Sequence, residues 1–280
     1  MSKKLLVVLL LGSSSVAYAE GSPWLLEDGG ANFGISVLSG STRDFFIGDT
    51  SMDLGDDLEG TFIWLNASYG YDDVWAFDIR TGYARSQLDG NIVDGEQVEQ
   101  SDVNDTSLGV SYQFLNEFEQ DNGLPTVSGR IGYTFGGDYE TDTIDAIGDG
   151  ASGFDVSLLV GKNLAPSFSL SGDLTYRQRD DDVADAVKFL LSGNYAAPIT
   201  GLSFQLGYGL IRTDSDIDIG GPGFGADQFP ETDKSSDWLI TSANYGFSNG
   251  IGINFSLSTV LDGRNIADTN IATFGLSYTL

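Results

Sequence analysis

The sequence predicts an all-β fold, a transmembrane antiparallel β-barrel, and three observations support this prediction. Apolar residues recur at every second position in many segments, which is the period of a strand. The positions between them carry mainly Gly, Ser, Thr, Asn and Gln, so each predicted strand has one apolar and one polar face. No stretch approaches the ~20 consecutive apolar residues that a membrane-spanning helix needs. We therefore expect an up-and-down barrel.

The first residues have the layout of a secretory signal peptide. Lys3 and Lys4 precede a short apolar run, and the small residues Ala17 and Ala19 mark a cleavage site. We expect residues 1–19 to be removed and residues 20–280 to form a single barrel domain. The apolar run is too short to span a bilayer as a helix. The chain is therefore predicted to be exported without a helical anchor.

Twelve segments of alternating character follow along the chain, and their number predicts a twelve-stranded barrel. Val110 and Tyr112, for example, alternate with Gly109, Ser111 and Gln113. In order, the apolar faces of the predicted strands lie within residues 33–37, 63–69, 75–83, 108–114, 127–135, 154–160, 168–176, 187–195, 202–210, 239–247, 251–257 and 272–280.

Charged residues inside the strands favour a membrane barrel over a soluble sandwich, which also alternates. All of the charges that lie well inside the segments fall in the polar register, and we expect them to line a pore. They are Asp78, Arg80, Arg130, Asp155, Asp173 and Lys188. An apolar face that excludes charge over the ~9–11 residues needed to cross a bilayer fits contact with lipid.

The connections between the strands form two sets. Alternate connections are short or of modest length, such as "KNLAPS" and "SNG". The other set includes long acidic stretches, at residues 41–60, 88–105, 137–150 and 213–237. Short periplasmic turns and long extracellular loops are the arrangement of outer-membrane barrels. One of the long loops, such as residues 88–105, is a candidate for tucking inside the barrel.

On these features the whole mature chain resembles the bacterial outer-membrane β-barrel proteins of the porin type. Its last strand also resembles the C-terminal assembly signal of that family, through Phe274, Leu276, Tyr278 and Leu280. The family usually ends in Phe or Trp, and Leu280 departs from that pattern. The resemblance implies a location in the cell outer membrane, contact with outer-membrane lipid, and recognition by the outer-membrane insertion machinery.

Composition excludes several functions. The chain contains no Cys and no His, so it has no disulfide, no thiolate metal site and no Ser-His nucleophile. We expect no enzymatic activity and no cofactor. The formal net charge is −28, with 41 acidic and 13 basic residues. Nucleic acid is not an expected partner, because phosphate backbones require Lys and Arg.

The remaining functions are a small channel and a barrel that acts through its loops. A phospholipase of this family would need a His, and acidic-sugar porins line their lumens with many bases. Here three interior acids oppose three bases. The sequence favours a weakly cation-selective passive channel for ions or small solutes, because acidic loops concentrate cations. The alternative is a non-conducting barrel with a structural or surface-binding role.

One acidic loop also contains a candidate site for a divalent cation. Asp214, Asp216 and Asp218 have the spacing that opens a calcium-binding loop. Gly220 comes one residue late and the twelfth position is Gly225, so the full pattern fails. Two interpretations of this loop are retained, a loosely bound divalent ion and a solvated acidic surface. No firm metal site is predicted.

Overall fold

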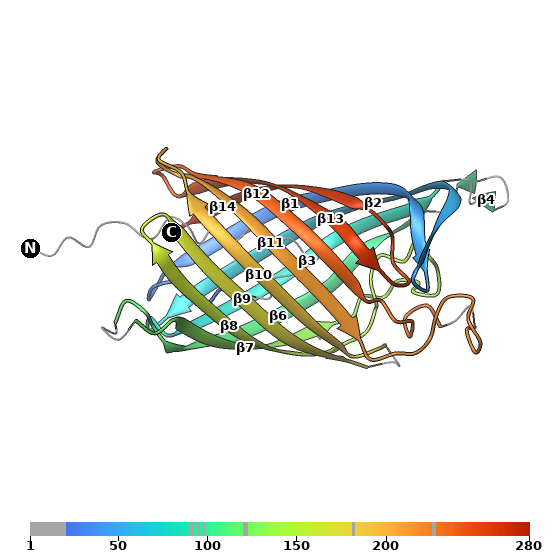
Figure 1. Cartoon of the computed structure of the whole chain (residues 1–280), viewed down its shortest axis with the longest axis horizontal. Coiled ribbons are helices and arrows are strands. Elements are labelled where there is room, and N and C mark those ends of the chain that lie inside the picture. Colours follow the sequence, from blue (N-terminus) through green and yellow to red (C-terminus); the bar gives the residue numbers. More distant parts are fainter. Residues whose placement is uncertain are drawn as a thin grey trace, which may run out of the picture.

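The computed structural model describes residues 21–280 except 90–91, 94–95, 98, 120–122, 181–182 and 226–227. The predicted signal peptide, residues 1–19, lies outside the described residues. Within the described part, twelve antiparallel strands form one closed barrel, which confirms the predicted fold and strand number (Figure 1). No helix of the described part is long and apolar enough to cross a membrane.

Each barrel strand pairs with the barrel strand that follows it. The strands are β1 (Ala31–Ile47), β2 (Thr50–Tyr71), β3 (Trp75–Leu88), β6 (Gln100–Leu115), β7 (Thr126–Phe135), β8 (Gly153–Ala165), β9 (Phe168–Arg179), β10 (Ala186–Ala196), β11 (Leu202–Thr213), β12 (Ser236–Gly246), β13 (Ile251–Gly263) and β14 (Asn270–Thr279). The short strands β4 (Ile92–Val93) and β5 (Glu96–Gln97) form a separate hairpin in the connection between β3 and β6.

The barrel closes where β1 pairs with β14. The register runs from Asn32 opposite Thr279 to Ser41 opposite Asn270. Beyond it, the Leu280 N–H donates a hydrogen bond to the Ala31 carbonyl, with 2.8 Å between the two atoms. Closure leaves the barrel without an open edge, and this matters because each unpaired backbone group in hydrocarbon costs several kcal/mol.

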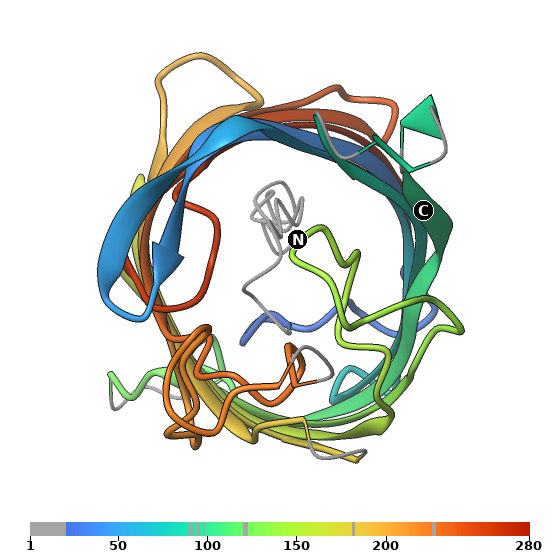
Figure 2. The same ribbon diagram turned by 90° about the vertical axis from the view of Figure 1, so that its right-hand side faces the viewer.

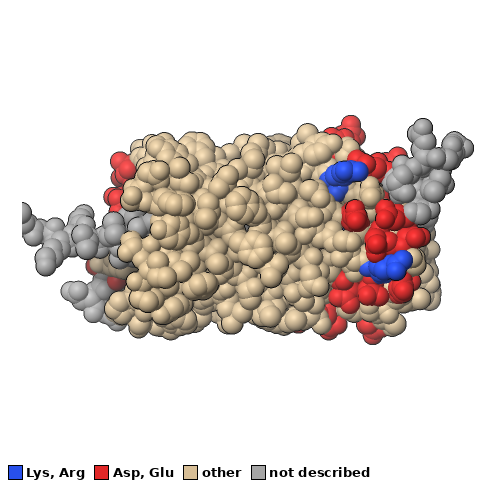
Figure 3. Space-filling view, turned by 90° about the horizontal axis from the view of Figure 1, so that it is seen from above, with Lys and Arg blue, Asp and Glu red and all other residues tan. Residues whose placement is uncertain are grey.

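The outer face of the barrel is apolar over a wide band. Ile131, Leu206 and Phe255 are about half exposed or more, although they lie in the middle of strands. Phe274, Leu276, Tyr278 and Leu280 point outward in the same way. Figure 3 shows a band without Lys, Arg, Asp or Glu, bordered by a dense group of acidic residues at the end that carries the long loops. Such a band has the apolar character of the lipid-facing surface of membrane barrels.

Two of the segments expected to be loops are largely strand. The pairing of β1 with β2 continues beyond a bulge at Thr42 to the last pair, Ile47 with Thr50. The pairing of β3 with β6 continues to Ser86 opposite Gln100, so residues 100–105 of the segment expected to tuck inside form part of the barrel wall. The physical reason is that a barrel wall can extend beyond the bilayer by backbone pairing with polar side chains on both faces.

Candidate functional site

The interior of the barrel brings together two of the charges that the sequence singled out. Arg130 on β7 holds Asp78 on β3 through two contacts, Nε to Oδ1 at 2.9 Å and Nη2 to Oδ2 at 2.6 Å. The guanidinium crosses the intervening strand β6 directly above Gly109, where a Cβ atom would lie 2.3 Å from Nη2. Glycine at this position therefore allows the bidentate pair to form. Arg130 is buried, with 3% of its surface exposed.

A second charged group lies toward the extracellular end of β8 and β9. Asp155 contacts Arg177 at 3.1 Å and Arg179 at 3.3 Å. Asp155 was predicted to line the pore, but both arginines were not, because the predicted apolar face of their strand ended at Tyr176. Arg177 and Arg179 continue the polar register of Asp173, and this period of two was the signal that could have found them.

The other three predicted pore-lining charges also lie on the inner side of the barrel. Asp173 is buried on β9 and accepts a hydrogen bond from the Thr175 hydroxyl at 2.8 Å. Lys188 is buried inside the barrel at the extracellular end of β10. The guanidinium carbon of Arg80 lies 4.0 Å from the ring centroid of Trp64. The structure thus places all six charges on the inner side, while their role in a pore stays a prediction.

Opposite the charged strands, the inner wall is apolar, which the sequence analysis did not predict. Trp238, Ile240 and Val260 form a buried cluster with partly buried Leu190, Ile211 and Ile271. Phe62 and Trp64 add to this wall from β2. The signal was the loss of alternation, as in "FIWL" at 62–65 and "WLI" at 238–240, where both faces of a strand are apolar.

A cavity of about 510 Å³ lies between this apolar wall and the extracellular loops. Its apolar lining comes from strands β1, β2, β10, β11, β12 and β14 and from four loops. Its charged lining residues in the described part are Glu59, Asp149, Arg177, Lys188 and Lys234. At the height of this cavity along the barrel axis, the lumen therefore has an apolar side and a charged side.

The loop between β7 and β8, residues 136–152, folds into the lumen (Figure 2). The Tyr139 hydroxyl and the Gly137 N–H both donate to Asp105 Oδ1, at 2.6 and 2.9 Å. Asn104 Nδ2 donates to the Ile147 carbonyl at 2.5 Å. Burial, together with the Asp105 carboxylate, raises the pKa of Tyr139 above its usual value, so this hydroxyl stays protonated and remains a donor. These contacts anchor the β7–β8 loop to β6.

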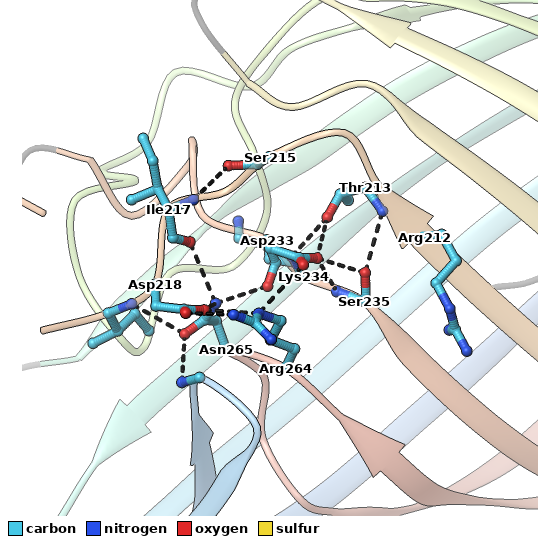
Figure 4. A network of polar contacts seen from close by, with 12 residues as sticks. Arg212, Thr213, Ser215, Ile217, Asp218, Asp233, Lys234, Ser235, Arg264 and Asn265 are labelled. Carbon is cyan, nitrogen blue, oxygen red and sulfur yellow. Dashed lines mark hydrogen bonds and ion pairs between the residues drawn. The ribbon is translucent and has the colours of Figure 1, made fainter. Parts of the chain in front are cut away.

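Three other extracellular segments meet at Asn265 (Figure 4). Asn265 Nδ2 donates to Asp218 Oδ1 at 2.9 Å and to the Asp233 carbonyl at 2.8 Å. Its Oδ1 accepts from the Gly48 N–H at 2.9 Å. Arg264 adds a bidentate pair with Asp218, at 2.8 and 2.5 Å. The β11–β12 loop (214–235), the β13–β14 loop (264–269) and the end of the β1–β2 hairpin are thereby joined over the mouth.

One residue of the candidate divalent-cation site, Asp218, is bonded to Asn265 and Arg264 in this network. The hydrogen bond from Asn265, assisted by the Arg264 guanidinium, holds the pKa of Asp218 below its usual value, so its carboxylate is charged and engaged. The structure does not bring Asp214 and Asp216 together with it as a metal-binding group. Among the described residues, no group of three or more acidic side chains has the arrangement to hold a metal ion.

The β7–β8 loop also contacts the β11–β12 loop. Lys234 Nζ lies 2.8 Å from Asp149 Oδ1, and both residues line the cavity. Burial disfavours the charged form of Asp149, but the neighbouring Lys234 outweighs it and lowers the pKa to about 2. The Asp149 carboxylate is therefore ionised at neutral pH, and the ion pair persists there.

The N-terminal segment, residues 21–27, lies inside the periplasmic end of the barrel (Figure 2). The Pro23 carbonyl accepts hydrogen bonds from Gln113 Nε2 at 3.0 Å and Ser128 Oγ at 2.7 Å. Trp24 Nε1 donates to Glu117 Oε1 at 3.0 Å. This segment therefore crosses from β1 to the inner face of β6, β7 and β8 and narrows the periplasmic side of the lumen. No local pattern of residues predicts this position of the segment.

Solved structures with the same fold are outer-membrane proteins. An outer membrane channel from Pseudomonas putida F1 matches with a TM-score of 0.74 at 15% identity, over 94% of this chain and 99% of that chain. The NanC porin matches with a TM-score of 0.54 at 9% identity, over 88% and 100%. The translocator domain of the autotransporter NalP from Neisseria meningitidis matches with a TM-score of 0.50 at 13% identity, over 90% and 89%. The likeness confirms the predicted porin-type barrel fold.

The sequence comparison is more specific than the fold. No curated protein matches this chain significantly. The sequence profile of one family, described as the putative MetA-pathway of phenol degradation, matches residues 22–274. The match includes nearly all of the N-terminal segment, all the lumen charges described above and the first half of β14. This chain is a member of that family.

Proposed function

We propose that the protein is a passive outer-membrane channel for small solutes that combine an apolar ring with a polar group. The observation that carries the proposal is the cavity of about 510 Å³ inside the barrel, with one apolar and one charged side. The family description names phenol degradation, and a phenol has this combination of an apolar ring and a hydroxyl group. No catalytic step and no cofactor belong to the proposal.

The two-sided lumen gives a physical reason for such a preference. An arene that leaves water for the apolar wall gains roughly 25 cal/mol for each Å² of apolar surface that it buries. Its polar group can remain turned toward the charged wall and water. Passage also requires that the solute leave again, so binding in the cavity must stay weak.

For inorganic ions we propose a weak preference for cations. The acidic residues at the extracellular end outnumber the basic ones (Figure 3). Their field acts over about one Debye length, ~8 Å at physiological ionic strength, and raises the local concentration of cations. The inner charges are largely paired, as Arg130 with Asp78 and Asp155 with Arg177, so they add little net preference.

Single-channel recording in planar bilayers tests the proposal. We expect the refolded protein to conduct, and millimolar phenol to interrupt the current. Trp64→Gln, in the cavity wall, should weaken this interruption, whereas Trp75→Gln, on the outer face, should not. If phenol interrupts the current equally strongly in both variants, phenol does not pass through this cavity. A complete absence of conductance would favour the alternative, a non-conducting barrel with a structural or surface-binding role.

We also propose that the outer-membrane insertion machinery recognises the outward apolar residues of β14. They are Phe274, Leu276, Tyr278 and Leu280. A variant with Ser at Phe274 and Leu276 should be exported but should accumulate without the heat-modifiable gel mobility of a folded barrel. The matched control is Ser at Ile253 and Phe255, which lie opposite on β13. Equal folding of both variants in cells would contradict a signal specific to β14.

A further inference from the structure

The cavity lining contains more basic than acidic residues, whereas the chain as a whole contains more acidic than basic residues. Three of the 13 basic residues line it, namely Arg177, Lys188 and Lys234, compared with two of the 41 acidic residues, Glu59 and Asp149. Arg177 also pairs with Asp155, at 3.1 Å, and Asp149 is the acidic residue of the lining that contacts Lys234, at 2.8 Å. In a chain where acids outnumber bases about threefold, this is a local concentration of positive charge.

Asp149 reaches this position from an inserted loop rather than from the barrel wall. Its Oδ1 lies 2.8 Å from Lys234 Nζ, and Arg177 and Arg179 also act electrostatically on it. The two side chains are about one third exposed, 29% for Asp149 and 34% for Lys234, so a small molecule can reach the contact. The ion pair lies at the wall of the cavity, next to its apolar lining.

The apolar lining beside this pair fits the body of a small molecule. Ile144 and Ile147 come from the β7–β8 loop, Phe229 and Pro230 from the β11–β12 loop, and Trp238 from the barrel wall. A volume of about 510 Å³ is within the range of sites that bind small molecules. A ligand with its apolar body here would have its head group within reach of Lys234.

We propose that the cavity binds small amphipathic carboxylates, and that Asp149 occupies the head-group position on Lys234 until such a solute displaces it. The exchange replaces one charged hydrogen bond to Lys234 with another, so it costs little electrostatic energy. The solute gains apolar burial, and Asp149 returns to water. This inference rests on the proposed channel function, because it names the class of solute that the cavity retains.

Benzoate is the probe for the test, with benzyl alcohol as a neutral analogue and acetate as a head group without an apolar body. Binding is measured on refolded protein in detergent by calorimetry and by the fluorescence of Trp64 and Trp238, which line the cavity. Neither readout requires current, so a failure of conduction leaves this test intact. We expect saturable benzoate binding in the millimolar range, and about tenfold weaker binding of both analogues.

Variants assign the binding to the ion pair. Lys234→Gln should weaken benzoate binding about tenfold and leave benzyl alcohol unaffected, while Lys234→Arg should keep most of the affinity. Lys162→Gln, which removes the same charge at the periplasmic end, should have no effect. Asp149→Asn should bind benzoate more tightly than the wild type, because no resident carboxylate must leave.

Two results would overturn the proposal. The first is benzoate binding that is absent from the wild type, equal there to that of benzyl alcohol, or unchanged by Lys234→Gln. The second is weaker benzoate binding in Asp149→Asn than in the wild type, since Asp149 would then support the site rather than occupy it. Retained heat-modifiable mobility of each variant establishes that the barrel is folded, and Lys234→Arg tests the same position with the charge preserved.

Discussion

The guanidinium of Arg80 lies over the indole ring of Trp64, 4.0 Å from its centroid, where the charged wall of the lumen meets the apolar wall. The two residues are on neighbouring strands, and Gly82 opposite Trp64 leaves room for the ring, because a Cβ atom there would lie 2.6 Å from it. A cation–π contact of this kind is worth about 0.5–1 kcal/mol when exposed and about 2 kcal/mol when desolvated. It fixes the ring at the boundary of the two walls.

The lipid-facing register predicts a large difference between two adjacent residues of β11. Leu206 points outward and is 57% exposed, while the Gln205 side chain accepts a hydrogen bond from Ser242 inside the barrel. Leu206→Arg should lower the free energy of unfolding by roughly 2–4 kcal/mol, because it places a charge in hydrocarbon. Gln205→Arg should cost much less. Urea unfolding in lipid vesicles measures both, and equal costs would contradict the register.

The crossing of β6 by Arg130 predicts a packing effect at Gly109. Gly109→Ala would place a Cβ atom 2.3 Å from the guanidinium and should displace it from Asp78. We expect a loss of about 1–3 kcal/mol in the free energy of unfolding, as in other overpacked interiors. Gly275→Ala is the control, because the nearest atoms to its Cβ would be 3.7 Å away. Similar unfolding midpoints for the two variants would place Arg130 elsewhere.

The junction at Asn265 predicts that the extracellular loops can be released without unfolding the barrel. Asn265 has a backbone φ of 49°, which glycine tolerates, so Asn265→Gly removes the hydrogen bonds without adding strain. Limited proteolysis should cut the β11–β12 loop roughly tenfold faster or more, because at least three hydrogen bonds are lost.

The control for this junction is Asn249→Gly in the periplasmic turn between β12 and β13. Its side chain accepts a single hydrogen bond from the Ile251 N–H and contacts no extracellular loop. This variant should be cut at the wild-type rate. Unchanged cleavage in Asn265→Gly would mean that other contacts hold the loops, such as the ion pair of Lys234 with Asp149.

The N-terminal segment predicts a change in conductance at the periplasmic side. Trp24→Ala removes the hydrogen bond to Glu117 and the contact with Gly161, so the segment should leave the wall and widen the path. A larger single-channel conductance than that of the wild type is the expected result. Trp75→Ala, on the outer face, should leave conductance unchanged. If Trp24→Ala also leaves it unchanged, the segment does not limit the current.

The acidic extracellular end predicts how ion selectivity depends on salt. Reversal potentials should indicate a weak preference for cations at low ionic strength, and the preference should fade as salt screens the exposed carboxylates. The Debye length falls from ~10 Å at 0.1 M to ~3 Å at 1 M, so little preference should remain at the higher concentration. A preference that is equally strong at both concentrations would place its origin at charges inside the barrel, such as Asp78.

Residue alternation was sufficient to predict the barrel, because the sequence of each strand by itself shows which residues face outward and which face the lumen. Leu206 and Gln205 show this directly, since neither needs a distant partner to define its face. The apolar wall was harder to predict, because Phe62 and Trp64 interrupt the alternation without indicating what they pack against. The inserted β7–β8 loop could not be predicted, since its anchor joins Tyr139 to Asp105 on another strand. Contacts between distant residues leave no period in the sequence.

The pairing of β1 with β14 has a consequence for the order of folding. Asn32 and Thr279 are hydrogen-bonded although they are 247 residues apart in the sequence. Bringing such distant ends together costs about 5 kcal/mol of chain entropy, whereas each hairpin closes over a few residues. Contacts of high sequence separation form slowly, so the hairpins should assemble first and this seam last. Until the seam forms, the edge of β1 presents unpaired N–H and C=O groups to any other strand, and this interval is when the chain is most prone to aggregate.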